Sequence, residues 1–286
     1  MVSLYGVYQR LTGAYEDIEM WLDADMFEGI GARIYSTLEN PNVLGEYLII
    51  IITLTVAALY YFKKPLQKTA MLAVLGAAGL CMIFTLSRGA WIGLLFAAFI
   101  FIMLNDRRLI WLGIIALLIS PLILPNSVIE RITSIGNIAD TSTNYRVNIW
   151  LGSVLLLRTF WLSGIGLSTA SFVYVYTLFS YNAVYAPHSH NLFMQIAIDL
   201  GIFGFGVFIS FIFVAIKNLL AANLSKDKFI KIISGALCAS LAGYLLQGLT
   251  DNVWYNYRIV CFFWLLAAIS GTLYELKGDE VIVQKN

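Results

Sequence analysis

Charged residues are scarce in this sequence of 286 residues. Only 12% of them are Asp, Glu, Lys or Arg, whereas 60% are hydrophobic, and the mean hydropathy is +0.80. This apolar content exceeds what the core of a soluble protein can hide, and several apolar runs approach the roughly 20 residues that cross a bilayer. The composition therefore predicts a polytopic membrane protein, with membrane lipid around it and no nucleic acid as a partner.

Cysteine is also scarce, and its positions exclude a disulfide framework. Cys81, Cys238 and Cys261 all fall inside apolar runs, where they read as small core residues. Their positions do not suggest a metal cluster either. We therefore predict neither a metal nor a cofactor.

Histidine occurs only twice, and both copies lie in the segment 186–191, which reads Ala-Pro-His-Ser-His-Asn. An unperturbed histidine titrates close to neutral pH, so His188 or His190 could serve as a general base. The alternative is a simple helix start, in which Ser189 or Asn191 caps the next helix and the histidines lie at a membrane surface. Chemistry near neutral pH is expected here first.

Seven apolar segments are predicted to cross the membrane as helices, so the fold class is an all-α polytopic bundle. They divide the chain into an extracytoplasmic segment (1–42), four spans (43–124), an extracytoplasmic loop (125–190), and three spans with a cytoplasmic tail (191–286). The predicted spans are 43–62, 69–86, 90–104, 109–124, 191–216, 229–249 and 259–275. The first should follow a turn at residues 40–42, where Asn42 is a ready helix cap.

Lysines set the predicted orientation. Placing the connections 63–68, 105–108 and 217–231 and the tail 277–286 in the cytoplasm puts all nine lysines there, as the positive-inside rule prefers. Seven of the nine arginines then lie outside. Met1 also lies outside although no signal peptide precedes it, so we expect a fragment that lacks upstream helices; the alternative is that the N-terminal segment crosses unaided.

Two arginines stand out at the predicted outer face. Arg88 lies in a hairpin between two short spans, which makes it a functional candidate, with snorkelling to lipid headgroups as the alternative. Arg146 opens a predicted amphipathic helix over 145–160, which could lie along the membrane as a cover over a cavity. A bound anion would reconcile this cation with the dipole of the helix. The stripe of that helix consists of Val147, Trp150, Leu151, Val154, Leu155 and Arg158.

Further residues are candidates for supporting roles. Gly164 and Gly166 predict a tight turn and not a phosphate-binding loop, because no strand–helix unit surrounds them. Asp199 lies just over two turns from His190 and is a candidate buried polar partner. Asp251, at the outer end of the sixth predicted span, could orient a histidine or bind a sugar hydroxyl.

The sequence resembles the O-antigen ligase and polymerase superfamily, bacterial membrane glycosyltransferases that also include protein O-oligosaccharyltransferases. The resemblance covers about 33–275 and rests on four motifs in order. These are Arg33 to Asn42, Thr85-Leu-Ser-Arg-Gly-Ala-Trp91, Arg146-Val-Asn-Ile-Trp150 followed by Gly164-Ile-Gly166, and His188-Ser-His-Asn-Leu-Phe-Met-Gln195 followed by Leu200-Gly-Ile-Phe-Gly204. Members usually have more spans, in line with the expected loss of upstream helices.

The resemblance implies transfer of a saccharide from a polyprenyl-diphosphate carrier to a hydroxyl of a glycan, lipid or protein acceptor, without metal, at the outer face of the cytoplasmic membrane. By position, Arg88 and Arg146 would hold the diphosphate, since forked guanidinium groups neutralise it better than flexible ammonium groups. His190 would be the general base, with His188 second in line. The supporting candidates are Arg33, Asp251 and Asn191.

Three alternatives stay open. A transporter or flippase for lipid-linked saccharide would use the arginines only to guide an anionic headgroup, but its site should lie near the bilayer midplane, which is nearly uncharged here. A structural membrane subunit predicts that Arg146 and His190 face apart. The third alternative is that the chain is an inactive fragment. The choice between ligase and polymerase depends on which acceptor reaches the histidine.

Overall fold

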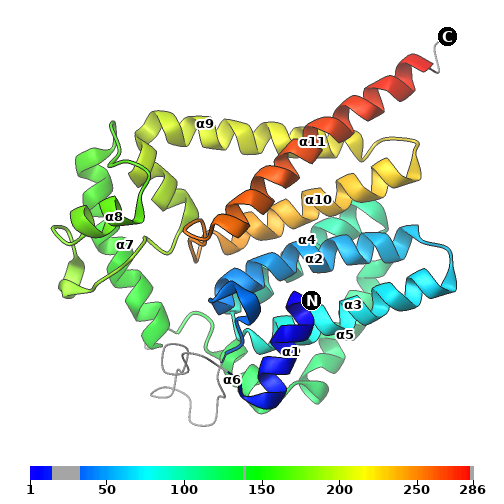
Figure 1. Ribbon diagram of the computed structural model, residues 1–286, viewed down its shortest axis with the longest axis horizontal. Helices are drawn as coiled ribbons and strands as arrows, with labels where there is room; N and C mark the ends of the chain where they lie inside the picture. Colours follow the sequence, from blue (N-terminus) through cyan, green and yellow to red (C-terminus); the bar gives the residue numbers. More distant parts are fainter. Residues whose placement is uncertain (15–32, 138–139, 284–286) are drawn as a thin grey trace.

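The computed structural model describes residues 1–14, 33–137 and 140–283, and this part of the chain contains helices and no strands (Figure 1). The predicted all-α membrane bundle is confirmed. Six helices are long and apolar enough to cross a membrane, and α5, which is shorter and contains Pro121, corresponds to the remaining predicted span. The helices are α1 (Val2–Thr12), α2 (Pro41–Tyr61), α3 (Pro65–Phe84), α4 (Arg88–Asn105), α5 (Leu109–Ile123), α6 (Asn126–Thr133), α7 (Thr141–Phe160), α8 (Thr169–Tyr176), α9 (Leu192–Ala222), α10 (Lys228–Gln247) and α11 (Tyr257–Val283), with short 3-10 helices η2 (Ser36–Leu38) and η3 (Tyr181–Ala183).

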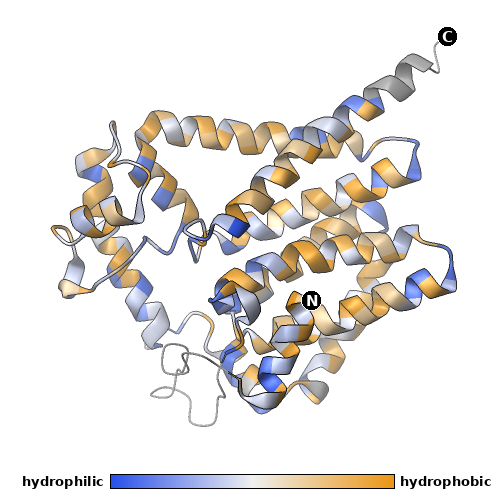
Figure 2. Ribbon diagram, in the orientation of Figure 1, coloured by the Kyte–Doolittle hydropathy of each residue, from blue (hydrophilic) through white to orange (hydrophobic). Residues whose placement is uncertain are grey.

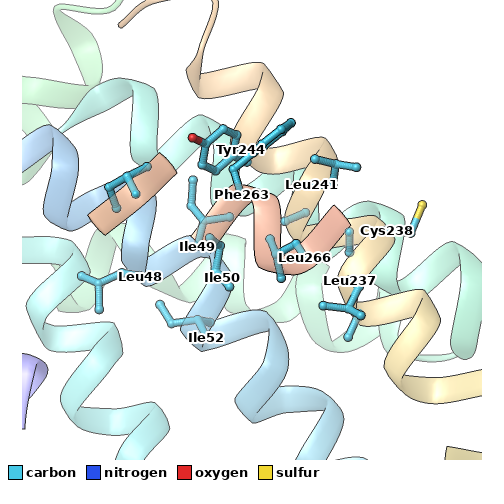
Figure 3. Close-up of a cluster of buried hydrophobic side chains, with 14 of the residues drawn as sticks. Leu48, Ile49, Ile50, Ile52, Leu237, Cys238, Leu241, Tyr244, Phe263 and Leu266 are labelled. Carbon is cyan, nitrogen blue, oxygen red and sulfur yellow. The ribbon is translucent and has the colours of Figure 1, made fainter. Parts of the chain in front are cut away.

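Helix α10 lies at the centre of the bundle. It packs against α2, α4, α9 and α11, and its buried side chains include Leu241 and Tyr244. Figure 3 shows these side chains in one apolar cluster with Ile49 of α2 and Phe263 of α11. Because lipid supplies little hydrophobic force between helices, such close packing must hold them together. It also fixes the end of α10, from which the segment 248–256 continues.

The start of α2 differs from the prediction. Asn40, and not Asn42, caps the helix, since its side-chain oxygen accepts a hydrogen bond from the Asn42 N–H and Pro41 takes the first helical position. Both choices suit a helix start, because Asn is a favoured cap and proline lacks an N–H that would be unsatisfied there. The side chain of Asn42 is therefore available for contacts elsewhere.

Several lysines lie at one end of the bundle. The α2–α3 connection carries Lys63 and Lys64, and the α9–α10 connection carries Lys226; both lie at the right of Figure 1 and are hydrophilic in Figure 2. The starts of α2 and α9 and the segment 248–256 lie at the opposite end (Figure 1). These lysines therefore share one end of the bundle, as the predicted orientation requires.

The predicted fifth span is a broken helix. At Gly201, φ is 65° and ψ is −173°, so α9 changes direction there, and the segment 161–166 docks onto the break. A Cβ on Gly201 would lie 2.3 Å from the backbone oxygen of Leu162, and one on Gly164 would lie 2.4 Å from that of Asp199, so both positions require glycine. Three backbone hydrogen bonds join the segments: Ile165 N–H to Ile198 O, Gly166 N–H to Asp199 O, and Ile202 N–H to Trp161 O. The predicted glycine turn thus satisfies the backbone groups that the break exposes.

The predicted long loop is largely helical, and α7 is its longest element. In Figure 1, α7 runs steeply across the ends of α2 and α10, the orientation expected of a helix along a membrane surface. Its buried face carries Ile149 and Leu156, which pack with Phe172 and Tyr176 of α8 and with Ile198. The predicted stripe lies on another face, because α8 covers α7 from a side that the sequence pattern did not indicate. The exposed members of that stripe are Leu151, Val154 and Leu155.

Candidate functional site

Four arginines line one cavity of about 200 Å³. The cavity lies at the end of the bundle opposite the α2–α3 and α9–α10 connections, which carry the lysines (Figure 1). Arg88 begins α4, Arg131 lies in α6, Arg146 lies in α7, and Arg33 precedes α2. Asp251 is the one acidic residue among the described residues of the cavity wall. Such a cavity suits a polyanion, because guanidinium groups bind phosphate oxygens in pairs. Polar neutral groups in the wall come from Ser87, Ser142, Thr143 and Gln247.

The guanidinium of Arg88 is bound by Asp140. Nη2 lies 2.8 Å from Asp140 Oδ1 and Nη1 lies 3.0 Å from Oδ2, and the hydroxyl groups of Ser134 and Ser142 accept further hydrogen bonds at 2.8 and 2.6 Å. Burial alone would raise the pKa of Asp140, but Arg88 and Ser142 hold it well below its usual range. The predicted diphosphate ligand Arg88 therefore already holds a carboxylate of the protein itself.

Arg146 is placed differently from the prediction. Because α7 begins at Thr141, Arg146 lies in the second turn, and the carboxylate of Asp140 caps the helix by accepting the Thr143 N–H. Within the described part of the chain, the buried Nε of Arg146 makes no hydrogen bond, and neither does Nε1 of Trp150, which lines the same cavity one turn further along. Buried donors without a partner are unfavourable. A bound anion would satisfy both of them.

His190 and Asp251 form the centre of the site. Nδ1 of His190 lies 2.9 Å from Oδ1 of Asp251 across 61 residues of sequence. Oδ2 of Asp251 accepts a hydrogen bond from Asn42 Nδ2, and Oδ1 accepts one from the Asn252 N–H. Burial alone would raise the pKa of Asp251, but His190, with help from Arg146, holds it well below its usual range. Asp251 is therefore ionised at neutral pH and able to orient His190.

Asn42 connects this pair to the arginine cavity. Its side-chain oxygen accepts hydrogen bonds from Arg33 Nη2 at 2.9 Å and from Ser87 Oγ at 2.8 Å. Its amide nitrogen donates to Asp251, as described above. A continuous network thus leads from Arg33 through Asn42 and Asp251 to His190. Two of the three supporting candidates, Arg33 and Asp251, belong to this network.

His188 is a buried neighbour of His190. Their ring centroids lie 4.1 Å apart, and the His188 ring stacks on Tyr255 at 5.0 Å. Burial first, and His190 second, lower the pKa of His188 to about 3, so the ring is neutral at pH 7 and a poor base. Its Nδ1 accepts the backbone N–H of His190, which leaves Nε2 as the N–H donor of the ring. The residue predicted as a second base is thus better suited to donate a hydrogen bond.

The group formed by His188, His190 and Asp251 has the spacing of a possible metal site. Each residue offers a ligand atom, and these atoms all lie within 4.8 Å of one another. In the structure, however, His190 Nδ1 pairs with Asp251 and His188 Nδ1 pairs with the backbone of His190. A cation held by these atoms would have to replace both hydrogen bonds. The predicted metal-free chemistry therefore calls for a direct test with a chelator.

The remaining candidates have partners of their own. Asn191 caps α9 by accepting the Met194 N–H at 2.9 Å, which is the capping role that the sequence offered as an alternative. Asp199, predicted as a partner of His190, instead accepts a hydrogen bond from Gln195 Nε2 at 2.9 Å. Neither residue lines the arginine cavity.

Sequence reasoning missed Asp140 and Arg131. Arg131 is 3% exposed and lies 3.6 Å from Asp140, so both belong to the wall around Arg88. Asp140 had a detectable signal, because Asp followed by Thr-Ser-Thr before an apolar run is typical of a helix start. Arg131 had none, since its place depends on how α6 folds back toward the start of α4.

A second cavity, of about 270 Å³, lies beside the histidines. Its wall contains aromatic, amide and carboxyl groups, and its described residues include no lysine or arginine. It therefore differs in charge from the arginine cavity. His190 contacts one wall residue of each cavity, Asp251 of the first and His188 of the second.

Comparison with known proteins adds one match. Residues 72–209 match the family model described as O-antigen ligase, and this region contains Arg88, Asp140, Arg146 and both histidines. No curated protein matches the chain.

Proposed function

Because the chain belongs to the O-antigen ligase family, we propose that it transfers a saccharide from a polyprenyl-diphosphate carrier to an acceptor hydroxyl at the outer face of the cytoplasmic membrane. The family match and the apolar helices support a membrane glycan-ligase role in general. The carrier, the acceptor hydroxyl and the side of the membrane are the parts that we add.

The observation that carries the proposal is the position of Asp251. Its side chain lines the arginine cavity and also accepts a hydrogen bond from His190. An anion-binding cavity and a histidine oriented by a carboxylate are thus joined by one residue. Glycosyl transfer from a diphosphate requires this proximity, because the leaving oxygen and the attacking hydroxyl meet at one carbon.

The proposed reaction uses His190 as the general base. An Nδ1–H donated to Asp251 leaves Nε2 with a lone pair, which accepts the proton of the acceptor hydroxyl. The oxygen of that hydroxyl bonds to the anomeric carbon, and the bond from this carbon to the diphosphate oxygen breaks, with its electron pair leaving on the diphosphate. Asp251 stabilises the imidazolium that forms, and the arginines stabilise the charge on the leaving group.

Arg146 is the proposed first ligand of the diphosphate. Its Nε and the Trp150 Nε1 both lack a partner within the described residues, whereas Arg88 holds Asp140. Arg88 would bind the diphosphate by exchanging Asp140 for a phosphate oxygen. A bidentate guanidinium can make this exchange without losing a hydrogen bond.

The proposed side of the membrane follows from the lysines. Lys63, Lys64 and Lys226 lie at the end of the bundle opposite the site, and lysine-rich connections prefer the cytoplasm (Figure 1). The arginine cavity and His190 would then open on the outer side, where a carrier that has crossed the membrane presents its saccharide.

Transfer by the purified protein tests this proposal. The donor is a polyprenyl-diphosphate oligosaccharide extracted from the source cells, and the product is measured by mass with and without a chelator. Wild type should transfer equally in both cases, and Arg146→Lys should keep only weak activity, because lysine preserves the charge and loses the planar fork. Full activity of Arg146→Lys would contradict the diphosphate role, and loss of wild-type activity on chelation would contradict the metal-free mechanism.

Surface glycan from a deletion strain separates the two members of the proposed class. Loss of a polymerase should leave single repeat units, whereas loss of a ligase should leave long lipid-linked chains. Mass analysis of the glycan distinguishes these outcomes. An unchanged glycan would contradict both.

A further inference from the structure

The second cavity has the chemistry of a saccharide site. Its wall includes His188 and Tyr255, whose rings stack on one another, and Asp199 and Gln195 from the first part of α9. Ligand pockets typically combine apolar and aromatic surface with a few polar groups that fix orientation. Sugar rings match this combination, because their C–H faces pack on aromatic rings and their hydroxyl groups need both donors and acceptors.

The polar groups of the wall leave hydrogen-bonding capacity for a ligand. Oδ1 of Asp199 accepts from Gln195, and within the described residues Oδ2 makes no hydrogen bond. Asn252 accepts the Trp254 N–H through Oδ1, and its Nδ2 makes no hydrogen bond within the described part of the chain. Together with Nε2–H of the neutral His188, these groups offer an acceptor and two donors. A hydroxyl-rich ligand can use all three.

Charge separates the two cavities. Four arginines line the first, whereas the described wall of the second has one carboxyl group and no lysine or arginine. A diphosphate therefore favours the first cavity, and a neutral polyhydroxylated molecule favours the second. His190 is in neither wall but contacts Asp251 of the first and His188 of the second, so a single residue separates its ring from each cavity.

We propose that the second cavity binds the acceptor, and that the acceptor is a saccharide whose hydroxyl is presented to His190. This inference rests on the function proposed above and adds the cavity and the side chains that bind the second substrate. The acceptor hydroxyl gives its proton to His190 and its oxygen to the anomeric carbon of the donor. Asp199 and Tyr255 bind the acceptor ring and take no part in the bond changes.

Steady-state kinetics with both substrates varied test the inference. The variants are Asp199→Asn, which keeps the oxygen that accepts from Gln195, and Tyr255→Leu, which removes the aromatic face. Each should raise the KM for a saccharide acceptor about tenfold, the effect of one lost hydrogen bond or aromatic contact, and change the donor KM less than twofold. Tyr255→Phe should restore the acceptor KM, which a merely destabilised protein would not do.

Matched controls lie away from the cavity. Asp106→Asn removes a carboxylate that also accepts from one side chain, Tyr60, in the α4–α5 connection. Tyr274→Leu removes a half-exposed aromatic side chain of α11. Neither control should change the KM for the acceptor or for the donor. The inference is wrong if Asp199→Asn or Tyr255→Leu raises the donor KM instead, or leaves the acceptor KM unchanged while transfer proceeds.

A binding measurement separates failure of the inference from failure of the proposed function. The probe is free oligosaccharide released by mild acid from the lipid-linked pool of the source cells, observed by saturation-transfer NMR with the full chain in detergent. Wild type and Arg146→Lys should both transfer saturation to the probe. The double variant Asp199→Asn/Tyr255→Leu should not. No saturation by wild type overturns the saccharide cavity even if transfer occurs. Saturation transfer that depends on Asp199 supports saccharide binding in the second cavity even if no donor is consumed. A failure to consume donor overturns the proposed function alone.

Discussion

Asp140 and Arg88 form a two-pronged ion pair that joins the first residue of α4 to the cap of α7. The two nitrogen–oxygen distances are 2.8 and 3.0 Å, and 52 residues of sequence separate the partners. Asp140 also caps α7 through the Thr143 N–H, so one carboxylate fixes both the guanidinium and the start of the helix that carries Arg146. Under the proposed function, an external diphosphate must compete with this internal anion for Arg88.

Replacing Asp140 by Asn should make the protein depend on an added anion. Asn is as good a helix cap as Asp, so α7 keeps its start, but the charge of Arg88 loses its partner at 11% side-chain exposure. A loss of about 3 kcal/mol in unfolding free energy is expected, because an uncompensated buried charge remains. Inorganic pyrophosphate should then raise the Tm of the variant more than that of wild type.

Thermal unfolding in detergent, with and without pyrophosphate, checks this prediction. Asp106→Asn is the matched control, since Asp106 accepts from Tyr60 and has no arginine pair like that of Asp140 within the described residues. Equal pyrophosphate shifts in Asp140→Asn and wild type would show that Asp140 does not occupy an anion position.

Removal of the ring of His190 should abolish transfer. Loss of a general base typically lowers a rate about 100- to 10,000-fold. His190→Asn is the most informative change, because Asn tolerates the left-handed backbone at this position, where φ is 49°, and its amide can still donate to Asp251. Near-wild-type Tm with transfer below 1% of wild type, roughly the effect of a missing base, is the expected result. Retained transfer by this variant would remove His190 from the mechanism.

The stability of the protein should fall as the pH drops from 7 to 5, and His188 should be a main cause. Its pKa is about 3 in the folded protein against 6.5 in an unfolded chain, so between these values the unfolded state binds a proton that the folded state does not. The contribution of His188 to the free energy of unfolding is therefore complete above pH 6.5. It decreases by about 1.4 kcal/mol per pH unit below that value. Asp251, with a lowered pKa, adds a loss only below about pH 4.

The pH dependence of Tm in His188→Asn tests this assignment. The side-chain oxygen of Asn can accept the His190 N–H as Nδ1 does now, and it does not titrate in this range. Its Tm should vary less between pH 5 and 7 than that of wild type. An unchanged slope would place the pH-sensitive group elsewhere.

The glycine at the break of α9 should not tolerate a side chain. Gly201→Ala places a methyl group 2.3 Å from the Leu162 oxygen in a left-handed conformation, and strain of this kind costs about 1–3 kcal/mol before the clash is added. Gly206 lies further along the same helix, and a Cβ there meets nothing within 4 Å. Gly206→Ala should leave Tm unchanged or raise it. Equal Tm values for the two variants would contradict the docking of the segment 161–166.

The membrane helices were predictable because each depends mainly on its own composition. An apolar run of nearly membrane length crosses the bilayer as a helix whatever its neighbours are, and α2, α3, α4 and α10 agree with their predicted spans within a few residues. The outer region was less predictable. The stripe predicted for α7 did not indicate the face that packs on protein, because that face depends on α8 and on Ile198, which are distant in sequence.

The candidate site was partly predictable because composition alone makes its residues stand out. Unusual residue types in a mostly apolar chain identified Arg88, Arg146 and the histidines, and the structure brings the two arginines to one cavity. Sequence could offer Asp251 as one partner for a histidine among several, but it could not single out the pair with His190, since two separate helix ends must meet. Arg131 depends on tertiary packing alone.

The hydrogen bond between Asn42 and Asp251 has a consequence for the time at which the candidate site becomes complete during synthesis. Its two ends are 209 residues apart in the sequence. At about 5–20 residues per second, the ribosome completes Asp251 roughly 10–40 s after Asn42. His190 is completed 61 residues before Asp251 and so lacks its carboxylate for roughly 3–12 s, although the arginines of α4, α6 and α7 have already been synthesised. Under the proposed function, a nascent chain could therefore bind a lipid-linked diphosphate before it could use it, and transfer would begin only after α10 and Asp251 have been synthesised.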